Sequence, residues 1–397
     1  MREKKMRAKL EDFLQEVCEK TITNNQYPVL TSSKSGLFLQ SDYFNKQVAS
    51  KDNTGYKIIR RGQFTYRAMS DTGEFFPNML ECADVGIVSP AYPVFEIIKQ
   101  DQIVPEYLNY YFKSNRFQNS ISTFAQGSTR TSVKFGKLKK VSIELPEIKK
   151  QYQIIRTLDL LRTIINNRKK EVLELDELIR ARFVEMFQDG SSPLKTVEEV
   201  CSNIVDCPHT TPKYEGELKN PAIRTSEIKK GFLVWNTMRY VSDDEYLERT
   251  VRLIPEAGDI VYGREGAFGN AAILPTGYKF CLGQRVMLLR PDYSKCTSEY
   301  LLHAVISDDV YQQAVVKNNA STVAHVNVKD VKQFKVPLPS LYKQKEFATF
   351  VHQIDKSKLL SGCRLFHSWA PENRDKPKHV GVPRRRTKDL REGRRQQ

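Results

Sequence analysis

One segment of this chain carries a long and regular hydrophobic pattern. Between residues 147 and 187, apolar side chains recur at alternating steps of four and three: Ile154, Leu158, Leu161, Ile165, Val172, Leu175, Ile179 and Met186. Only Arg168 and Arg182 interrupt the stripe, and no Pro or Gly occurs between Pro146 and Gly190. The pattern predicts one helix of roughly 60 Å with a coiled-coil seam. Because a lone helix cannot bury such a stripe, we expect a second helix alongside it.

The regions on either side of this helix show shorter patterns. Residues 55–69 alternate as strands around a glycine turn, 85–98 form a second β-rich stretch, and 138–146 read as a strand closed by proline. Residues 105–125 have helical spacing with a turn before Phe117. The second half repeats this order, with a glycine-punctuated hairpin at 258–274, a helix at 298–315, a strand at 331–339 and the start of another long helix at 340–358.

The two halves also match residue by residue. The segment 106–108 recurs as 299–301, Ser128-Thr129 as Ser321-Thr322, and Leu145-Pro146 with Lys150-Gln151 as Leu338-Pro339 with Lys343-Gln344, all 193 positions apart. Further upstream, Gly62 matches Gly258 at 196 positions. A period this long indicates two copies of a whole domain rather than a solenoid repeat. Two such copies can present two similar surfaces, which suits a two-sided ligand such as duplex DNA.

These patterns predict an α+β protein in which two similar α/β domains are separated by long antiparallel helices, the second of them truncated. The expected divisions are a first domain at 1–146, a central spacer helix at 147–189, a second domain at 190–339, the start of a second spacer helix at 340–360, and a disordered basic tail at 361–397. The tail holds four tryptophan or proline residues that rule out a continuing helix, namely Trp369, Pro371, Pro377 and Pro383. A native basic arm and a changed reading frame are both open explanations for it, and we favour the second.

Charge and composition narrow the class of partner. The net charge of +16 suggests a polyanion, although the tail contributes +7 of it through eleven Lys/Arg against four Asp/Glu. No apolar run is long enough to cross a membrane, and the N-terminus has no secretory pattern. Seven scattered cysteines fit free thiols in a reducing cytoplasm.

We find no signature of catalysis or of a cofactor. An Asn/Asp-Pro-Pro-Tyr motif, a glycine-rich cofactor loop, a Walker A lysine and a nucleophile elbow are all missing. Cys201, Cys207 and His209 lie close in sequence, but their spacing is not a zinc pattern and lacks a fourth ligand. We therefore expect a chain without metal or cofactor that is not an enzyme alone.

Two kinds of loop carry candidate DNA contacts. Arg264 stands among the turn glycines of 263–270, and Arg60, Arg61 and Arg67 flank the matching turn of the first copy. Their alternative roles are a tight turn and a solvated strand edge. The paired loops 126–138 and 319–331 carry polar side chains suited to phosphates and base edges, although such residues also cap strands and helices. Ser-Thr persists in both loops, whereas Arg130/Val323 and Ser132/His325 differ. This predicts constant backbone positioning with different bases read.

Several phrases together resemble the DNA-specificity (S) subunit of type I restriction-modification systems. YPVLTSSKSGLFLQSDYF (27–44), VDCPHTTPKY (205–214), AIRTSEIKKGFL (222–233) and GDIVYGREG (258–266) are similar to parts of its target-recognition domains. LPEIKKQYQII (145–155) and ELDELIRARFVEMF (174–187) are similar to the two ends of its central spacer. The resemblance covers about residues 8–358, and the ragged C-terminus departs from it, which puts docking of one partner in doubt.

The resemblance implies a non-catalytic, cytoplasmic subunit of a host-defence complex that reads an asymmetric bipartite site on double-stranded DNA. Its partners would be methyltransferase (M) subunits, docked through the spacer, and restriction/translocase (R) subunits. We expect DNA contacts from Lys34, Arg60, Arg61, Arg67, Gln126, Ser128, Thr129, Arg130, Arg224, Lys229, Lys230, Arg264, Asn319, Ser321, Thr322, His325 and Asn327. The spacer contacts would be Leu158, Leu161, Ile165, Val172, Leu175 and Ile179. The alternatives are a coiled-coil adaptor that binds only proteins, a type IIB/IIG-like specificity subunit, and a self-contained nuclease or methyltransferase with an unfamiliar active site.

Overall fold

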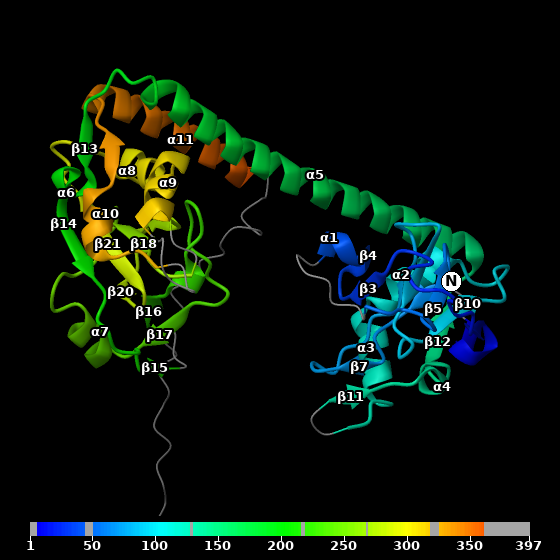
Figure 1. The fold of residues 1–397 in the computed structure, drawn as a ribbon. Helices are drawn as coiled ribbons and strands as arrows, with labels where there is room; N and C mark the ends of the chain where they lie inside the picture. The colour runs from blue at the N-terminus through cyan, green and yellow to red at the C-terminus, as the bar shows by residue number, and fades with distance from the viewer. Residues whose placement is uncertain are drawn as a thin grey trace, which may run out of the picture. The chain divides into compact units, whose positions relative to one another are not determined.

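The computed structural model describes residues 6–43, 51–127, 130–215, 219–266, 269–317 and 325–360. The chain divides into two compact units, Met1–Asn166 and Asn167–Gln397, called unit 1 and unit 2 below. This division falls inside the helix α5 (Ile148–Phe187), which confirms the single long helix predicted from the hydrophobic stripe (Figure 1). The expected domain boundaries on either side of that helix remain predictions.

Unit 1 is a set of short strands followed by short helices. Its elements before α5 are β1 (Met6–Lys9), η1 (Leu10–Asp12), β2 (Leu14–Val17), β3 (Leu30–Ser33), β4 (Gly36–Leu39), α1 (Gln40–Tyr43), β5 (Lys57–Arg60), β6 (Phe64–Thr65), β7 (Met69–Ser70), β8 (Asn78–Met79), β9 (Val85–Val88), β10 (Val94–Ile97), α2 (Pro105–Phe112), α3 (Asn115–Ser122), β11 (Thr131–Ser132), α4 (Phe135–Leu138) and β12 (Ser142–Leu145). Phe64, Phe95 and Phe112 pack together in its core, with ring centroids 5.5 to 6.2 Å apart.

Unit 2 follows the same order. After α5 come β13 (Leu194–Thr196), α6 (Val197–Val200), β14 (Cys201–Asp206), β15 (Tyr214–Glu215), β16 (Asn220–Ile223), η2 (Thr225–Glu227), β17 (Arg239–Val241), α7 (Asp243–Arg249), β18 (Ile260–Gly263), β19 (Ala271–Ile273), β20 (Cys281–Leu282), β21 (Val286–Pro291), α8 (Ser298–Val305), α9 (Asp308–Lys317), α10 (Val328–Gln333), β22 (Lys335–Pro337) and α11 (Leu341–Leu360).

The central sheet is built alike in both units. Unit 1 has the strand order β2-β10-β6-β8 and unit 2 has β14-β21-β18-β19, with antiparallel neighbours throughout. In each unit an outer pair joins the first strand to the last, β1 with β12 and β13 with β22. Gly62 and Gly258 both adopt positive φ (85° and 93°), as a matched turn requires. Unit 2 adds a second four-stranded sheet, β15-β17-β16-β20, whereas the remaining strands of unit 1 form three separate pairs, β3-β4, β5-β9 and β7-β11.

A buried glutamine shows that the repeat extends to individual hydrogen bonds. The side chain of Gln151 accepts from the backbone N–H of Val104 (2.9 Å) and donates to the carbonyls of Gln102 (2.8 Å) and Pro146 (2.9 Å). The side chain of Gln344 accepts from Thr297 (2.9 Å) and donates to Lys295 (2.9 Å) and Pro339 (3.0 Å), every partner 193 positions later. Both glutamines are completely buried. The same three bonds therefore fix the start of the long helix in each copy.

Most predicted elements are confirmed, and two need correction. The strands around Gly62, the hairpin at 258–274 and the helical stretches at 105–125 and 298–315 are present, with each helical stretch divided by a serine, Ser114 or Ser307. The strands expected at 138–146 and 331–339 are shorter, namely β12 and β22, because the helices α4 and α10 come first and α10 occupies the start of the second segment. A helix of one or two turns is too short to show a period in the sequence.

The second long helix is antiparallel to the end of the first. Lys358 pairs with Asp176 (2.7 Å) and Arg182 with Glu346 (3.2 Å), while the rings of Phe183 and Phe347 lie 5.6 Å apart. Figure 1 shows α11 along the C-terminal part of α5. The helix pair predicted from the stripe is thus confirmed over this stretch. The expected tail, 361–397, lies outside the described residues.

Candidate nucleic-acid interface

The two loops singled out in the sequence occupy matched positions on a shared backbone frame. In unit 1, β7 pairs with β11, so that Met69 stands opposite Ser132. In unit 2 the matched residues, Glu265 and His325, form an antiparallel bridge. One further hydrogen bond continues each pairing, from Val133 to Ala68 (2.9 Å) and from Val326 to Arg264 (3.0 Å). The frame is therefore constant, whereas the side chains on it differ between the copies.

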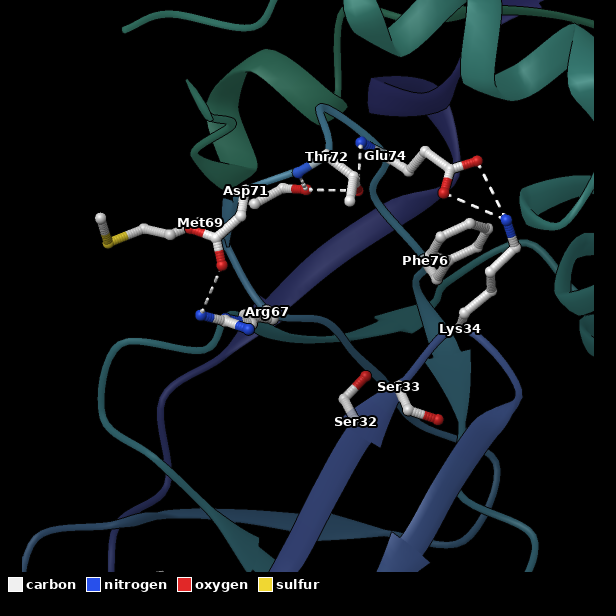
Figure 2. A pocket seen from close by; sticks show the side chains of 10 residues that line it. Ser32, Ser33, Lys34, Arg67, Met69, Asp71, Thr72, Glu74 and Phe76 are labelled. Atoms are coloured by element: carbon white, nitrogen blue, oxygen red, sulfur yellow. Dashed lines mark hydrogen bonds and ion pairs between the residues drawn. The ribbon is translucent and has the colours of Figure 1, made fainter. Parts of the chain in front are cut away.

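In unit 1 the frame gathers three of the predicted cations. Arg130 pairs with Asp71 (Nε–Oδ1 2.9 Å), and Arg67 approaches the other oxygen of Asp71 at 3.7 Å. Lys34 donates to both carboxylate oxygens of Glu74 at 3.1 Å. Lys34, Arg67, Asp71 and Glu74 line a single hollow together with Ser32, Ser33, Met69, Ser70, Thr72 and Phe76, as Figure 2 shows. The exposed ion pairs of Lys34 and Arg67 can exchange a carboxylate for a phosphate at little cost, because surface pairs contribute little to stability.

Gln126 shapes the loop that leads into this cluster. Its backbone exchanges two hydrogen bonds with Ser132, at 3.1 and 2.8 Å, which close the loop on itself. Gly127 stands at φ 120° where a Cβ would meet the carbonyl oxygen of Arg130 at 2.1 Å, so this position requires glycine. Ser128 and Thr129, two further predicted contacts, lie outside the described residues.

Arg60 and Arg61 are not brought into this cluster. Arg60 pairs with Glu19 (2.8 Å), while Arg61 pairs with Asp84 (2.8 Å) and donates to the carbonyl of Glu81 (2.6 Å). Arg61 lines a different hollow, which shares no residue with the one at Lys34 and contains Glu81, Glu96 and Glu106. An acidic lining does not favour a nucleic acid. The sequence pattern grouped Arg60, Arg61 and Arg67 around one turn, but the fold places Arg67 in the cluster and the other two outside it.

In unit 2 one carboxylate joins a histidine and an arginine. Glu265 pairs through Oε1 with His325 (3.2 Å) and through Oε2 with Arg285 (2.9 Å). His325 also lies 3.3 Å from the amide oxygen of Asn327, whose nitrogen donates to Asp330 (3.2 Å). The predicted residues His325 and Asn327 thus belong to one polar cluster. Asn319, Ser321 and Thr322, and the variable position Val323, lie outside the described residues.

Arg264 occupies an interior position. Its side chain is only 6% exposed, pairs with Asp206 (2.8 Å) and donates to the carbonyl of Val326 (3.5 Å). Its Nε has no hydrogen-bond partner among the described residues. The buried guanidinium contacts the 325–327 segment from the interior and fixes its position. The expected direct contact of Arg264 with DNA does not fit this geometry.

The remaining predicted cations of unit 2 lie apart from this cluster. Arg224 pairs with the buried Glu227 and approaches the ring of Tyr214 (5.8 Å to the centroid), which Arg239 also covers at 4.9 Å. Lys229 is exposed. Lys230 reaches Asp308 at 3.9 Å and the ring of Tyr311 at 5.7 Å. Arg224 is therefore committed to its acid, whereas the two lysines remain accessible to a ligand.

Sequence reasoning missed three members of these clusters. Arg285 has φ +64°, which is uncommon for a residue with a side chain. No pattern in the sequence marks this backbone conformation. Asp71 and Glu265 carry no signal in the sequence that would place them beside the predicted cations. Their positions show that each acid orients an arginine.

The predicted spacer residues fall into two groups along α5. Val172 and Ile179 are buried, with 3% exposure each, and Ile179 belongs to the unit 2 core with Phe183 and Phe187. Leu161 and Ile165 are 50% and 43% exposed, and Leu160 and Ile164 beside them are similarly open. Leu158 and Leu175 are partly buried. The stripe therefore anchors unit 2 at one end and presents an apolar patch, Leu160, Leu161, Ile164 and Ile165, in the middle.

The cysteine–histidine segment has no metal-site geometry. Cys207 is buried, His209 lies 3.6 Å from Asp206, and burial raises the pKa of the Cys201 thiol to about 12. No group of three or more His, Cys, Asp or Glu suited to a metal occurs within the described ranges. Over the same part of the chain, no helix has the length and apolar character needed to span a bilayer.

Comparison with known proteins identifies the family. The family model of the type I restriction modification DNA specificity domain matches residues 10–175 and 213–362. The MjaIX specificity subunit of Methanocaldococcus jannaschii is 32% identical over 110 residues, which are 28% of this chain and 25% of that protein. The EcoBI specificity subunit of Escherichia coli is 29% identical over 136 residues, 33% of this chain and 28% of that protein. The matches thus span about a quarter of the length of these curated relatives.

Two solved structures are similar to this chain. A chain from a study of complex assembly and conformational transition of the type I R-M system superposes with a TM-score of 0.53 at 15% identity, covering 91% of this chain and 93% of that one. The type I restriction-modification S subunit from M. genitalium gives 0.49 at 15% identity and covers 92% of each chain. The first likeness supports the α+β fold with two similar domains. Since the family model matches more than half of its residues, the chain belongs to the type I restriction modification DNA specificity domain family.

Proposed function

We propose that this chain is the sequence-specific DNA-binding subunit of a type I restriction-modification complex and reads an asymmetric, two-part site. The observation that carries the proposal is the repeated frame with unlike side chains, Met69 and Ser132 in one copy against Glu265 and His325 in the other. Two identical frames would suit two half-sites of one duplex. Different side chains on them would select different bases.

The contacts divide by the chemistry of each residue. Lys34 and Arg67 in unit 1, and Lys229 and Lys230 in unit 2, are accessible cations suited to phosphates, which supply affinity without sequence information. The loop residues Gln126, Arg130, His325 and Asn327 are suited to base edges. Arg264 and Arg224 position the loops from within, while Arg60 and Arg61 take no part in this assignment. Ser128, Thr129, Asn319, Ser321 and Thr322 remain predicted contacts.

The partners follow from the family and from the open patch on α5. We assign Leu160, Leu161, Ile164 and Ile165 to contact with a methyltransferase subunit, because exposed apolar side chains grouped on one helix indicate an interface. Restriction/translocase subunits would join the larger complex. The chain would supply recognition only, with the methyl transfer and cleavage carried out by these partners. A cytoplasmic location stays a prediction.

The test is DNA binding by the full chain, alone and co-expressed with its candidate methyltransferase. We expect selection of a split sequence from random duplexes, with an affinity that falls steeply as salt increases. Failure to bind any duplex in the presence of the partner would support a protein-only adaptor instead. Metal- or cofactor-dependent turnover by the chain alone would support a self-contained enzyme, and cleavage by a complex lacking separate translocase subunits would support a type IIB/IIG-like system.

A further inference from the structure

Arg285 is held in a conformation that costs stability. It lies in the turn between β20 and β21 with φ +64°, and left-handed backbone at a residue with a side chain is unfavourable. The turn is fixed on both sides. The carbonyl of Arg285 accepts from the backbone of Arg264 (3.0 Å) and from the hydroxyl of Thr225 (3.3 Å). An unfavourable backbone conformation that is kept at an exposed arginine indicates a role for the side chain.

The side chain of Arg285 is exposed but oriented. It is 63% accessible, and its Nε lies 2.9 Å from Oε2 of Glu265. The other carboxylate oxygen of Glu265 is held by His325 at 3.2 Å. Glu265 is therefore fixed by two partners and braces one edge of the guanidinium. Among the described residues Arg285 forms an ion pair with Glu265 alone, so the edge formed by its two terminal nitrogens can meet a planar acceptor pair.

Unit 1 has the same arrangement built from a different segment. Arg130 is 62% exposed, and its Nε lies 2.9 Å from Oδ1 of Asp71. Arg130 comes from the loop before β11, whereas Arg285 comes from the loop before β21. The pairing of an acid with Nε thus occurs in both copies, although the repeat does not match the two arginines with each other.

We infer that Arg285 and Arg130 are specificity-determining residues, each reading a guanine in one half of the site. This inference rests on the proposed DNA-binding function. The terminal edge of a guanidinium matches the O6 and N7 acceptors of guanine in the major groove, and a carboxylate on Nε sets the plane of that fork. A lysine in either place would keep the charge but lose the paired geometry.

The experiment is selection from random duplexes by the complete complex containing native chain, Arg285→Lys or Arg130→Lys. The native complex should select at least one G·C pair in each half-site. Arg285→Lys should reduce discrimination at one guanine of one half-site by about tenfold to a hundredfold and leave the other half unchanged. Arg130→Lys should do the converse. Arg252→Gln, at an exposed arginine outside the cluster, is the matched control and should change neither half.

Different outcomes would contradict the proposed function and the inference that rests on it. If the native complex selects no sequence, the proposed function fails and the inference with it. If it selects a split site but Arg285→Lys keeps full preference for each guanine, or a half-site has no G·C pair, only the inference fails. Uniform weakening on all sequences, with a smaller salt dependence, would assign Arg285 to a phosphate and also overturns the inference.

A second variant separates reading from folding. Arg285→Gly removes the side chain while allowing the left-handed backbone, so its melting temperature should equal or exceed that of the native chain. Its guanine preference should nonetheless be lost. A lower melting temperature together with native preference would mean that Arg285 serves the turn and not recognition.

Discussion

The two units share a backbone and differ in what they display on it. Gln151 and Gln344 make the same three hydrogen bonds, and Val133 and Val326 continue the same strand pairing. At the matched positions of the frame, unit 1 has Met69 and Ser132, whereas unit 2 has Glu265 and His325. Buried hydrogen bonds constrain residues tightly, because an unpaired buried group is costly. The frame positions are not buried, so they carry less of this constraint and can differ to set specificity.

The largest predicted effect is a difference in stability between substitutions in the C-terminal part and in the middle of α5. Ile179→Asp places a charge among Phe183 and the unit 2 core, and we expect it to lower the free energy of unfolding by about 5 kcal/mol. Leu161→Asp lies on the same stripe but is 50% exposed, and should cost less than about 1 kcal/mol in the free chain. Denaturant unfolding measures both. Equal losses would contradict the division of the stripe, while Leu161→Asp should reduce methyltransferase capture.

The buried glutamines should have equal importance in the two copies. Gln344→Ala leaves the N–H of Thr297 and the carbonyls of Lys295 and Pro339 without their partner, at a cost of about 4 kcal/mol. Gln151→Ala should cost the same in unit 1. Exposed Gln153 and Gln353 provide controls on the same two helices. Amide hydrogen exchange assigns each loss to its unit, and a loss confined to one copy would show that the repeated bonds are not equivalent.

A pH response should appear in only one unit. Desolvation between the rings of Phe183 and Phe347 lowers the pKa of His303 to about 4, with the Lys358 charge adding to the shift. Unfolded histidine titrates near 6.5. Between these values the unfolded chain binds a proton that the folded chain does not. Unit 2 should therefore lose up to about 3 kcal/mol as pH falls from about 6.5 to 4.

The repeat supplies the control for this response. The position matching His303 in unit 1 is Tyr110, so His303→Tyr should remove the acid-dependent loss without removing the ring. Hydrogen exchange of α8 measured at pH 7 and pH 5 reports the change. A variant that still loosens on acidification as the native chain does would place the sensitive group elsewhere.

The smallest effect should come from the arginines outside the clusters. Arg61→Gln breaks an exposed pair with Asp84, which contributes little, so DNA affinity and stability should each change by less than about 0.5 kcal/mol. Arg67→Gln, at the cluster in unit 1, serves as the comparison and should weaken binding on every sequence and reduce its salt dependence. If Arg61→Gln weakens binding as much as Arg67→Gln, the separation of these two sites is wrong.

The sequence predicted those elements whose cause is local and repeated. The structure contains both the long helix predicted from the stripe and the repeat predicted from the 193-residue spacing. A period over forty residues, or a match between two copies, is a stronger signal than any single residue. The one- or two-turn helices α4 and α10 are too short for that, and the sequence pattern places their residues in loops and, for Leu138 and 331–333, in the predicted strands.

The site was less accessible to sequence reasoning. Arg264 follows β18, whose four residues are all buried, so no alternation indicated which side its own side chain would take. Arg285 owes its place to a backbone conformation that no composition signal marks. The ion pairs of Arg130 with Asp71 and of Arg285 with Glu265 join segments some 60 and 20 residues apart, and only the fold brings these together.

The central claim is that two domains with the same backbone frame recognise different half-sites. Its most direct test is single-molecule methylation sequencing of a genome exposed to this chain with its methyltransferase. The experiment compares the native chain with one whose residues 194–338 come from a different specificity subunit. We predict a split, asymmetric methylated sequence for the native chain, and for the hybrid a change in one half only. A palindromic or uninterrupted sequence, or a change in both halves at once, would contradict the account.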